Sequence, residues 1–129
     1  MECHIYFDAS IQDFELRIGY QIIDSNGEII TSFGRNTLYS TDSTQGELIA
    51  LIHAVRRVIS HETFVEDLVL YSDNHSVVVM LDECEPASPS EEDISQLVTV
   101  AKRYLSSFNY KMRYIRSENN PAHNLAYHS

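Results

Sequence analysis

Three acidic residues, Asp8, Glu47 and Asp73, lie far apart in the sequence, yet each stands in or beside an apolar segment. Asp8 is near the end of the apolar stretch IYFDAS, where an isolated buried charge costs roughly tens of kcal/mol in the idealised limit. Carboxylates that converge from such positions repel one another unless a cation lies between them. Mg²⁺ and Mn²⁺ prefer oxygen ligands, so we interpret the three residues as candidate metal ligands.

Each carboxylate also has a structural interpretation that involves no metal. Glu47 follows Thr44 by three residues, which is the spacing of a capping box at a helix start. Asp73 has the position of an N-cap for a helix that follows it. No helix follows Asp8, so its alternative is a single buried ion pair with an arginine. The order of strand acid, helix acid and strand acid favours the metal site.

The spacing of apolar residues predicts an α/β fold, because alternation indicates strands and a helical period indicates helices. We expect strands at residues 4–9, 15–24, 28–34, 67–73 and 109–116. We expect helices at residues 43–60, 74–83 and 90–107, with a short one near the C-terminus. Asn26-Gly27 is a strong signal for a hairpin between the second and third strands.

The predicted architecture is a five-stranded mixed sheet with helices on both faces, formed by residues 1–129 as one domain. Sites in such sheets lie at strand ends and at neighbouring helix starts. If the first and fourth strands are neighbours, their ends bring Asp8 and Asp73 together, and a helix on the sheet brings Glu47 to the same point. Residues 84–90, CEPASPS, are the plausible linker, and they end in a helix N-terminus signal at residues 88–91.

The composition predicts a folded chain, with 43% apolar and 22% charged residues. No run of about 18 apolar residues predicts a membrane helix. The N-terminal MECHIYF lacks the features of a signal peptide. Cys3 and Cys84 are too few for a zinc ribbon and are interpreted as reduced thiols. We therefore expect a monomeric, cytoplasmic protein with no membrane partner.

The net charge of −10 indicates an acidic surface that does not by itself attract phosphate. Binding of nucleic acid would need divalent cations or a local basic strip. One interpretation of the acidic surface is adaptation to a high-salt cytoplasm.

The sequence resembles the type 1 ribonuclease H family over nearly its whole length. IYFDAS is similar to the family's first strand with its Asp, IDSNGEII to its second hairpin, and TQGELIALIHAV to its Glu-bearing helix. LVLYSDNHSVVVML is similar to the Asp strand with its following helix, and NNPAHNLA to the C-terminal motif. The separations, 39 residues from Asp8 to Glu47 and 26 from Glu47 to Asp73, suit the family.

This resemblance implies the ribonuclease H-like fold and an endonuclease that cleaves the RNA strand of RNA–DNA hybrids with two Mg²⁺ or Mn²⁺ ions. One ion would activate a water, and the other would stabilise the departing 3′ oxygen. By similarity, Asp8 bridges both ions and Asp73 is a further ligand. Glu47 binds one ion and contacts the ribose 2′-hydroxyl, which distinguishes RNA from DNA.

The family's fourth acidic position falls on His123. An imidazole binds Mn²⁺ or accepts a hydrogen bond from a metal-bound water, whereas Mg²⁺ prefers oxygen. The other interpretation of His123 is a surface histidine in a terminal helix. His75, two residues after Asp73, is a candidate for lining the same site.

The sequence departs from the family in other respects. Ala9 replaces the glycine that usually follows the first Asp, and RSENNPA has no flexible-loop histidine. The family's basic protrusion is missing, and Arg56 and Arg57 are interpreted either as a small phosphate contact or as solvated helix residues. These departures leave two alternatives open: a ribonuclease H-like module that binds nucleic acid or protein without cleaving, and a nuclease of this fold that acts on DNA.

Overall fold

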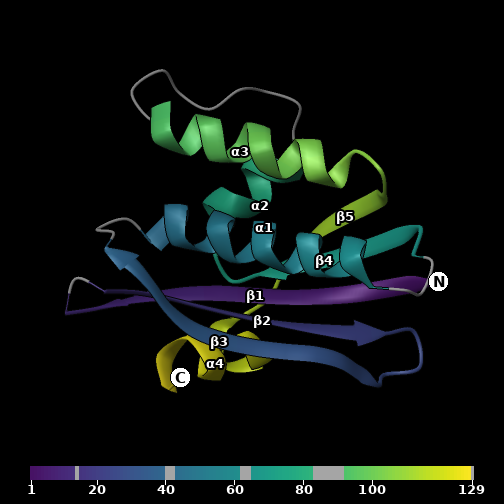
Figure 1. Ribbon diagram of the computed structural model, residues 1–129, viewed down its shortest axis with the longest axis horizontal. Coiled ribbons are helices and arrows are strands. Elements are labelled where there is room, and N and C mark those ends of the chain that lie inside the picture. Colours follow the sequence, from purple (N-terminus) through teal and green to yellow (C-terminus); the bar gives the residue numbers. More distant parts are fainter. Residues whose placement is uncertain (14, 40–42, 62–64, 83–91, 129) are drawn as a thin grey trace.

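The computed structural model describes residues 1–13, 15–39, 43–61, 65–82 and 92–128. Its elements follow the predicted order (Figure 1): β1 (Glu2–Gln12), β2 (Glu15–Asp24), β3 (Ile29–Tyr39), α1 (Ser43–Ser60), β4 (Asp67–Ser72), α2 (His75–Asp82), α3 (Glu92–Leu105), β5 (Asn109–Tyr114), the 3₁₀ turn η2 (Ser117–Asn119) and α4 (Pro121–His128). The predicted linker at residues 84–90 and the helix signal at 88–91 lie outside the described residues.

The five strands form one mixed sheet in the order β3-β2-β1-β4-β5. β2 pairs antiparallel with both β1 and β3, whereas β4 pairs in parallel with both β1 and β5. The predicted Asn-Gly hairpin joins β2 to β3, and Gly27 takes the left-handed φ of 82° that such turns favour. The first and fourth strands are therefore neighbours, as the placement of Asp8 beside Asp73 requires.

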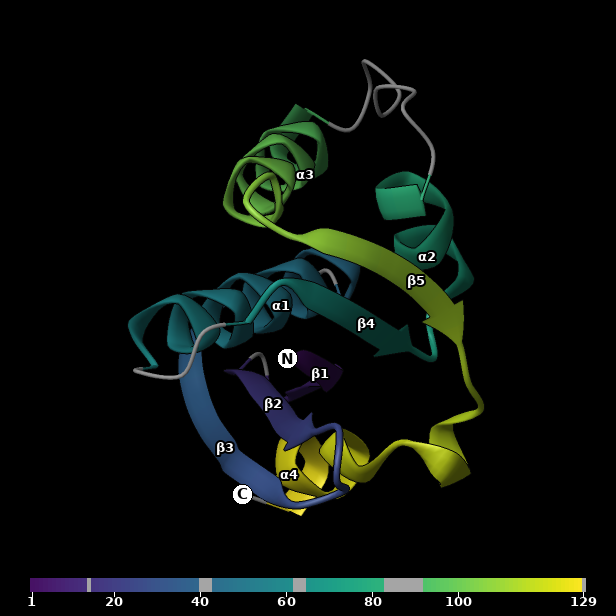
Figure 2. The ribbon, with the colours of Figure 1, turned by 90° about the vertical axis from the view of Figure 1, so that its right-hand side faces the viewer.

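Helices cover both faces of the sheet, which confirms the predicted fold class. Figure 2 shows α1, α2 and α3 on one side and α4 on the other. The main core lies under α1, where Ile5 and Phe7 of β1 are fully buried together with Leu48 and Leu51 of the helix. Each such side chain contributes about 1.5–3 kcal/mol when it leaves water. No helix in the described part of the chain is long and apolar enough to cross a bilayer.

α4 approaches the opposite face of the sheet closely because Gly19 of β2 has no side chain. A Cβ at Gly19 would lie 2.7 Å from both the Ala122 carbonyl oxygen and the Ala126 nitrogen. The Ser10 hydroxyl donates to the Ala126 carbonyl at 2.9 Å. These close contacts hold α4 against β1 and β2. The position of α4 in turn determines where the side chains that it directs toward β1 lie.

β1 is longer than the sequence predicts, since it runs to Gln12 rather than ending at residue 9. Its antiparallel pairing with β2 continues as far as Gln12 opposite Glu15, and this tertiary pairing outweighs local propensity. Asp8 therefore lies inside a strand and not at its end. The parallel ladder between β1 and β4, however, stops at Tyr6 opposite Tyr71, so Asp8 lies just past the point where these two strands separate.

Candidate active site

An open cavity of about 410 Å³ lies where β1 and β4 separate. Asp8 and Asp73 each follow the last ladder pair, Tyr6 and Tyr71, by two residues. Asp8 shares the face of β1 that carries α4, where it contacts His123. Asp73, just after the end of β4, lies beside both of them. The described residues that line the cavity come from four elements and their ends: Asp8, Ala9, Ser43, Glu47, Asp73, Asn74, His75, Ser76 and Tyr127.

Three of the predicted site residues converge closely. One ligand atom from each of Asp8, Asp73 and His123 lies within 4.8 Å of the other two. This set offers two carboxylate oxygens and one imidazole nitrogen, which suits Mn²⁺ well and Mg²⁺ through its oxygens. Glu47 lines the same cavity but is not part of this closest group.

Asp8 is only 4% exposed, and its carboxylate has two partners. The Ala9 backbone N–H donates to Oδ1 at 2.8 Å, and His123 Nδ1 lies 3.0 Å from Oδ2. Burial, with a further contribution from the Asp73 carboxylate, raises the pKa of Asp8 to about 6, although the Ala9 and His123 contacts oppose the rise. Among the residues that the structure describes, the ion-pair partner of Asp8 is a histidine and not the arginine of the alternative interpretation.

Asp73 does not cap α2, so its structural alternative is also wrong. Asn74 performs that role, since its Oδ1 accepts the Ser76 and Val77 backbone N–H groups at 2.9 and 3.3 Å. The Asp73 carboxylate is thereby left to face Asp8 across the cavity, where it raises the pKa of Asp8. Two acids so placed require a positive partner when both are ionised.

Glu47 is 3% exposed and lies in the second turn of α1, not in the first. The helix already begins at Ser43, so Thr44 is inside it and the predicted capping box is wrong. Instead, Asn74 Nδ2 donates to Glu47 Oε2 at 2.6 Å, and the Ser72 hydroxyl donates to Oε1 at 3.4 Å. Burial raises the pKa of Glu47 to about 8, with the Asn74 bond opposing and the Asp8 and Asp73 carboxylates adding to the rise.

His123 lies in the first turn of α4 and faces β1. The Asn120 side chain fixes this turn, because its Nδ2 donates to the Phe7 carbonyl at 3.0 Å and its Oδ1 accepts the Ala122 N–H at 3.0 Å. The His123 ring also lies 4.1 Å from the Tyr127 ring, one helical turn further on. His123 is half-buried in the site, so the interpretation as a solvated surface histidine is wrong.

Sequence reasoning missed Asn74 and Tyr127. Asn74 joins Glu47 to the start of α2. The sequence feature that could have revealed this role is its position, directly after Asp73 and directly before a predicted helix. Tyr127 lines the cavity, and the three carboxylates of Asp8, Asp73 and Glu47 raise its pKa after the larger effect of burial. The spacing of four residues from His123 to Tyr127 places both on one helix face.

His75, a candidate from sequence, does line the cavity, and its ring stacks on Tyr114 at a distance of 3.8 Å between ring centroids.

The metal-free protein is expected to lose stability as pH rises from about 4 to about 8. Carboxyl groups of an unfolded chain have pKa values near 4, whereas those of Asp8 and Glu47 in the folded protein are about 6 and about 8. The folded state therefore binds more protons in this range, so the free energy of unfolding falls as pH rises. Thermal midpoints measured over this range in a chelating buffer test the expectation. Glu47→Gln is expected to flatten the upper part of the curve; an unchanged slope in that variant contradicts the account.

The fold is ribonuclease H-like, with a five-stranded mixed sheet between α1–α3 and α4 and with acidic residues gathered where β1 and β4 separate. The chain belongs to the reverse transcriptase-like family, whose family model matches residues 7–129. No curated protein matches the sequence significantly.

Solved structures share this fold. The chain is similar to RNase H1 from the halophilic archaeon Halobacterium salinarum NRC-1, with a TM-score of 0.83 and 20% identity over 95% of this chain and 91% of that one. It is similar to the N-terminal RNase H domain of a Mycobacterium tuberculosis protein, with a TM-score of 0.83 and 16% identity over 97% and 90%. LC11-RNase H1 in complex with an RNA/DNA hybrid gives a TM-score of 0.74 and 17% identity over 95% and 92%. At these identities the likeness shows the fold alone.

Proposed function

We propose that this protein is a metal-dependent endonuclease that cleaves the RNA strand of RNA–DNA hybrids. The observation that carries the proposal is the convergence of Asp8, Asp73 and His123, whose ligand atoms lie within 4.8 Å of one another beside Glu47. The fold neighbours support it, since several are RNase H1 proteins and one was solved with an RNA/DNA hybrid.

The donor set fits a divalent cation. Asp8 is buried with a raised pKa beside a second carboxylate, so its ionised form lacks sufficient positive charge nearby. Asp8, Asp73, Glu47 and His123 are the residues that would hold Mg²⁺ or Mn²⁺. Such an ion, when bound, polarises the scissile phosphate and neutralises charge that develops on it.

The chain's own groups would hold this donor set in position. Asn74 fixes the Glu47 carboxylate through Nδ2 while its Oδ1 caps α2, so the two helices are joined at the site. Asp8 fixes the His123 ring through Nδ1. When Nδ1 carries the proton, the neutral ring keeps its lone pair on Nε2, which is then available to a metal or to a water.

A second candidate is a ribonuclease H-like module that binds nucleic acid without cleaving it. The contact between His123 and Asp8 favours it, because the buried carboxylate then has a side-chain partner at 3.0 Å without any metal. The two candidates differ in whether a divalent ion binds among Asp8, Asp73 and His123 or the contact between His123 and Asp8 exists without one.

Cleavage of labelled duplexes in Mg²⁺ and in Mn²⁺ tests the proposal. We expect the RNA strand of an RNA–DNA hybrid to be cut and an all-DNA duplex of the same sequence to remain intact, because recognition requires the 2′-hydroxyl. Since His123 supplies nitrogen, activity is expected to be higher in Mn²⁺ than in Mg²⁺. An intact hybrid under both ions favours the second candidate, and equal cutting of both duplexes contradicts the RNA specificity.

A further inference from the structure

Three aromatic rings form a stacked group on the sheet, next to the cavity: His4 and Tyr6 of β1 and Tyr71 of β4, called the aromatic platform below. The Tyr6 and Tyr71 rings stack with their centroids 4.3 Å apart and with 7° between their planes. The His4 ring stacks on Tyr71 at 5.7 Å, and His4 Nδ1 lies 2.8 Å from the Tyr71 hydroxyl. The three rings are therefore held together by contacts that define their orientations.

The aromatic platform lies on the face of the sheet opposite α1. His4 and Tyr6 alternate along β1 with Ile5 and Phe7, whose side chains are buried under α1. On the platform's own face, α4 packs on β1, β2 and β3, whereas in the described part of the chain β4 and β5 have α2 packed on them from the other face (Figure 2). All three rings are only half-buried, so part of each remains open to solvent.

Two cations of β5, Lys111 and Arg113, border the platform. Arg113 lies opposite Tyr71 in the ladder between β4 and β5, so the two side chains share a face of the sheet. Burial raises the pKa of Tyr71 and Tyr6 adds to the rise, while the nearby charge of Arg113 opposes it. Lys111 and Arg113 are exposed, and neither forms an ion pair with any residue that the structure describes.

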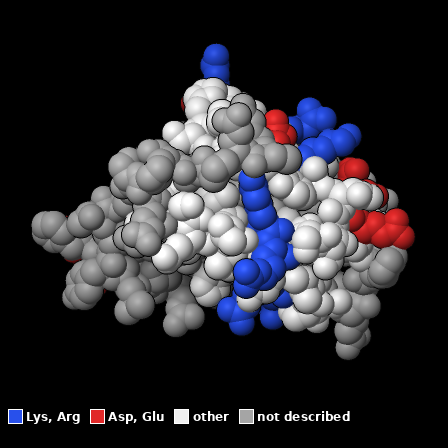
Figure 3. Space-filling view, turned by 90° about the horizontal axis from the view of Figure 1, so that it is seen from above, with Lys and Arg blue, Asp and Glu red and all other residues white. Residues whose placement is uncertain are grey.

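Positive charge alone does not distinguish this face of the molecule. Figure 3 looks onto the opposite side, over α3, and shows Lys and Arg side chains there as well. The combination of stacked rings with neighbouring cations is what distinguishes the platform. Its far end is acidic, because Glu2 and Asp67 form the ladder pair there and Glu2 contacts His4 Nε2 at 3.0 Å. The end that borders the cavity is therefore the one suited to an anionic ligand.

We infer that the aromatic platform binds an unpaired nucleic-acid strand, with bases stacked on its rings and phosphates beside Arg113 and Lys111. Aromatic rings bordered by cations bind single strands with little sequence preference, because every base has an aromatic face and the phosphates follow the backbone. A duplex keeps its base faces stacked inside the helix, so the platform would select unpaired nucleotides.

The position of the platform relates this ligand to the cavity. Tyr6 precedes Asp8 by two residues, which is about 7 Å along β1. An unpaired strand on the platform would therefore adjoin a hybrid bound at the carboxylates, as a single-stranded overhang of that hybrid does. The inference rests on the proposed function only for the identity of the ligand as nucleic acid, and it does not require that the carboxylate site be active.

The rings also have a purely structural role to be separated from binding, because cross-strand aromatic pairs stabilise a sheet. That role needs neither the open ring surfaces nor the cations of β5. Thermal midpoints of all variants are therefore measured beside their affinities, and the cations are tested separately from the rings.

Fluorescence anisotropy with a labelled oligothymidine of about 12 nucleotides, measured in EDTA, tests the rings. EDTA removes bridging divalent ions and prevents cleavage, so the result is independent of catalysis. We expect Tyr6→Leu to bind about 5- to 100-fold more weakly than the wild type, and Tyr6→Phe, which keeps the ring, to bind within about twofold of it. The matched control is Tyr104→Leu, which removes a half-buried ring from α3 and is expected to bind as the wild type does.

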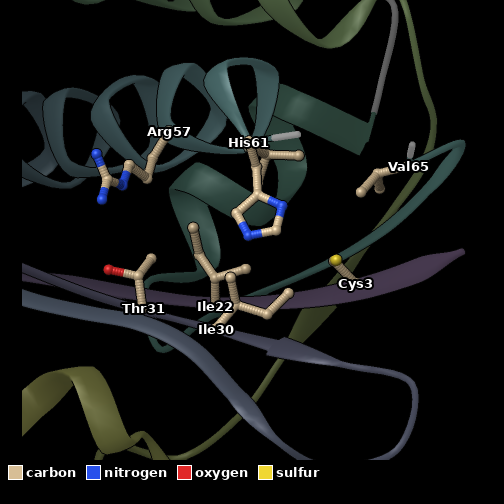
Figure 4. Close-up of a pocket in the computed structure, with 8 residues that line it drawn as sticks. Cys3, Ile22, Ile30, Thr31, Arg57, His61 and Val65 are labelled. Carbon is tan, nitrogen blue, oxygen red and sulfur yellow. The ribbon is translucent and has the colours of Figure 1, made fainter. Parts of the chain in front are cut away.

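The same titration at several KCl concentrations tests the cations. Arg113→Gln is expected to lower the slope of log affinity against log salt by about 0.7, with an unchanged thermal midpoint. Its control is Arg57→Gln, which removes an equal charge from α1. Figure 4 shows Arg57 over Thr31 on the α1 side of the sheet, away from the platform. We expect this control to keep the wild-type slope.

An oligonucleotide that carries 2-aminopurine distinguishes stacking from charge contact alone, because its fluorescence falls when the base stacks. We expect that fall with the wild type and not with Tyr6→Leu. Equal affinities of Tyr6→Leu and Tyr104→Leu would overturn the inference, and so would equal salt slopes of Arg113→Gln and Arg57→Gln, a result that stands even if Tyr6→Leu fails to fold. Platform-dependent binding without hybrid cleavage in Mg²⁺ or Mn²⁺ would refute the proposed function alone, whereas cleavage without platform-dependent binding would refute this inference alone.

Discussion

Asp8→Asn is expected to abolish hybrid cleavage, with a loss of more than about 10³-fold in both Mg²⁺ and Mn²⁺. Asn has nearly the same shape as Asp but no charge, so the variant removes a metal ligand and keeps the packing of β1. At pH 8 without metal, the same change is expected to raise the thermal midpoint by a few degrees. The reason is that Asp8 has a pKa of about 6 in the folded protein, so its ionisation at pH 8 opposes folding.

The control for Asp8→Asn is Asp13→Asn, which removes an equal charge from the neighbouring hairpin. Asp13 is exposed and has a left-handed φ of 53°, a conformation that Asn adopts readily. We expect this control to cleave as the wild type does. Equal rates for Asp8→Asn and the wild type, measured as initial velocities of hybrid cleavage, contradict the metal-site account. A midpoint lowered in Asp8→Asn at pH 8 contradicts the electrostatic part of it.

His123→Asp is expected to increase cleavage in Mg²⁺ by about tenfold or more and to reduce the preference for Mn²⁺. The carboxylate supplies an oxygen where the protein has nitrogen, and Mg²⁺ favours oxygen ligands. Without metal, the variant is expected to be less stable than the wild type, since a third carboxylate replaces the partner of Asp8 in a cluster whose ligand atoms lie within 4.8 Å. Addition of Mg²⁺ is expected to reverse this loss.

The matched control is His123→Asn, which has the shape of the Asp variant without its charge. It loses the contact with Asp8 and gains no anionic ligand, so we expect low activity in both metals. The two variants and the wild type are compared by cleavage rates in Mg²⁺ and in Mn²⁺, and by thermal midpoints with and without metal. If the Asp variant is less active than the wild type in Mg²⁺, the imidazole has a role that an oxygen ligand cannot replace.

Much of the fold follows from local patterns in the sequence. Ile5 and Phe7 alternate with Tyr6 and Asp8, and the structure buries the first two under α1 while Asp8 faces α4. The helical period of residues 43–60 gives the bounds of α1, because a long amphipathic segment is specified by many residues at once. Asn26-Gly27 fixes the hairpin through a backbone conformation that Gly adopts at little cost.

What the sequence could not predict depends on contacts between distant segments. β1 extends to Gln12 because β2 pairs with it that far, and no local signal contains that partner. Asn74 binds Glu47 while it caps α2, which requires α1 and α2 to be in place first. The spacing of Thr44 and Glu47 predicted a capping box. The buried Glu47 carboxylate instead accepts hydrogen bonds from side chains on the other side of the site.

The pairing of Asp8 with His123 shows the same limit. Alignment with a family motif placed His123 at an acidic position, yet only the packing of α4 on Gly19 shows how near its ring comes to β1. Asp8 and His123 are 115 positions apart in the sequence, and their contact explains how a buried strand tolerates an aspartate. In the metal-free protein His123 Nδ1 lies 3.0 Å from the Asp8 carboxylate, beside which a cation is expected to lie in the active protein.

The central claim is that Asp8, Asp73 and His123 hold a divalent ion with Glu47 beside them. Its most direct test is a crystal of the protein soaked in Mn²⁺, measured at a wavelength where manganese scatters anomalously. The account predicts an anomalous peak among these side chains, within bonding distance of the Asp8 carboxylate. A soaked crystal with no peak there, and with His123 still bonded to Asp8, would contradict it.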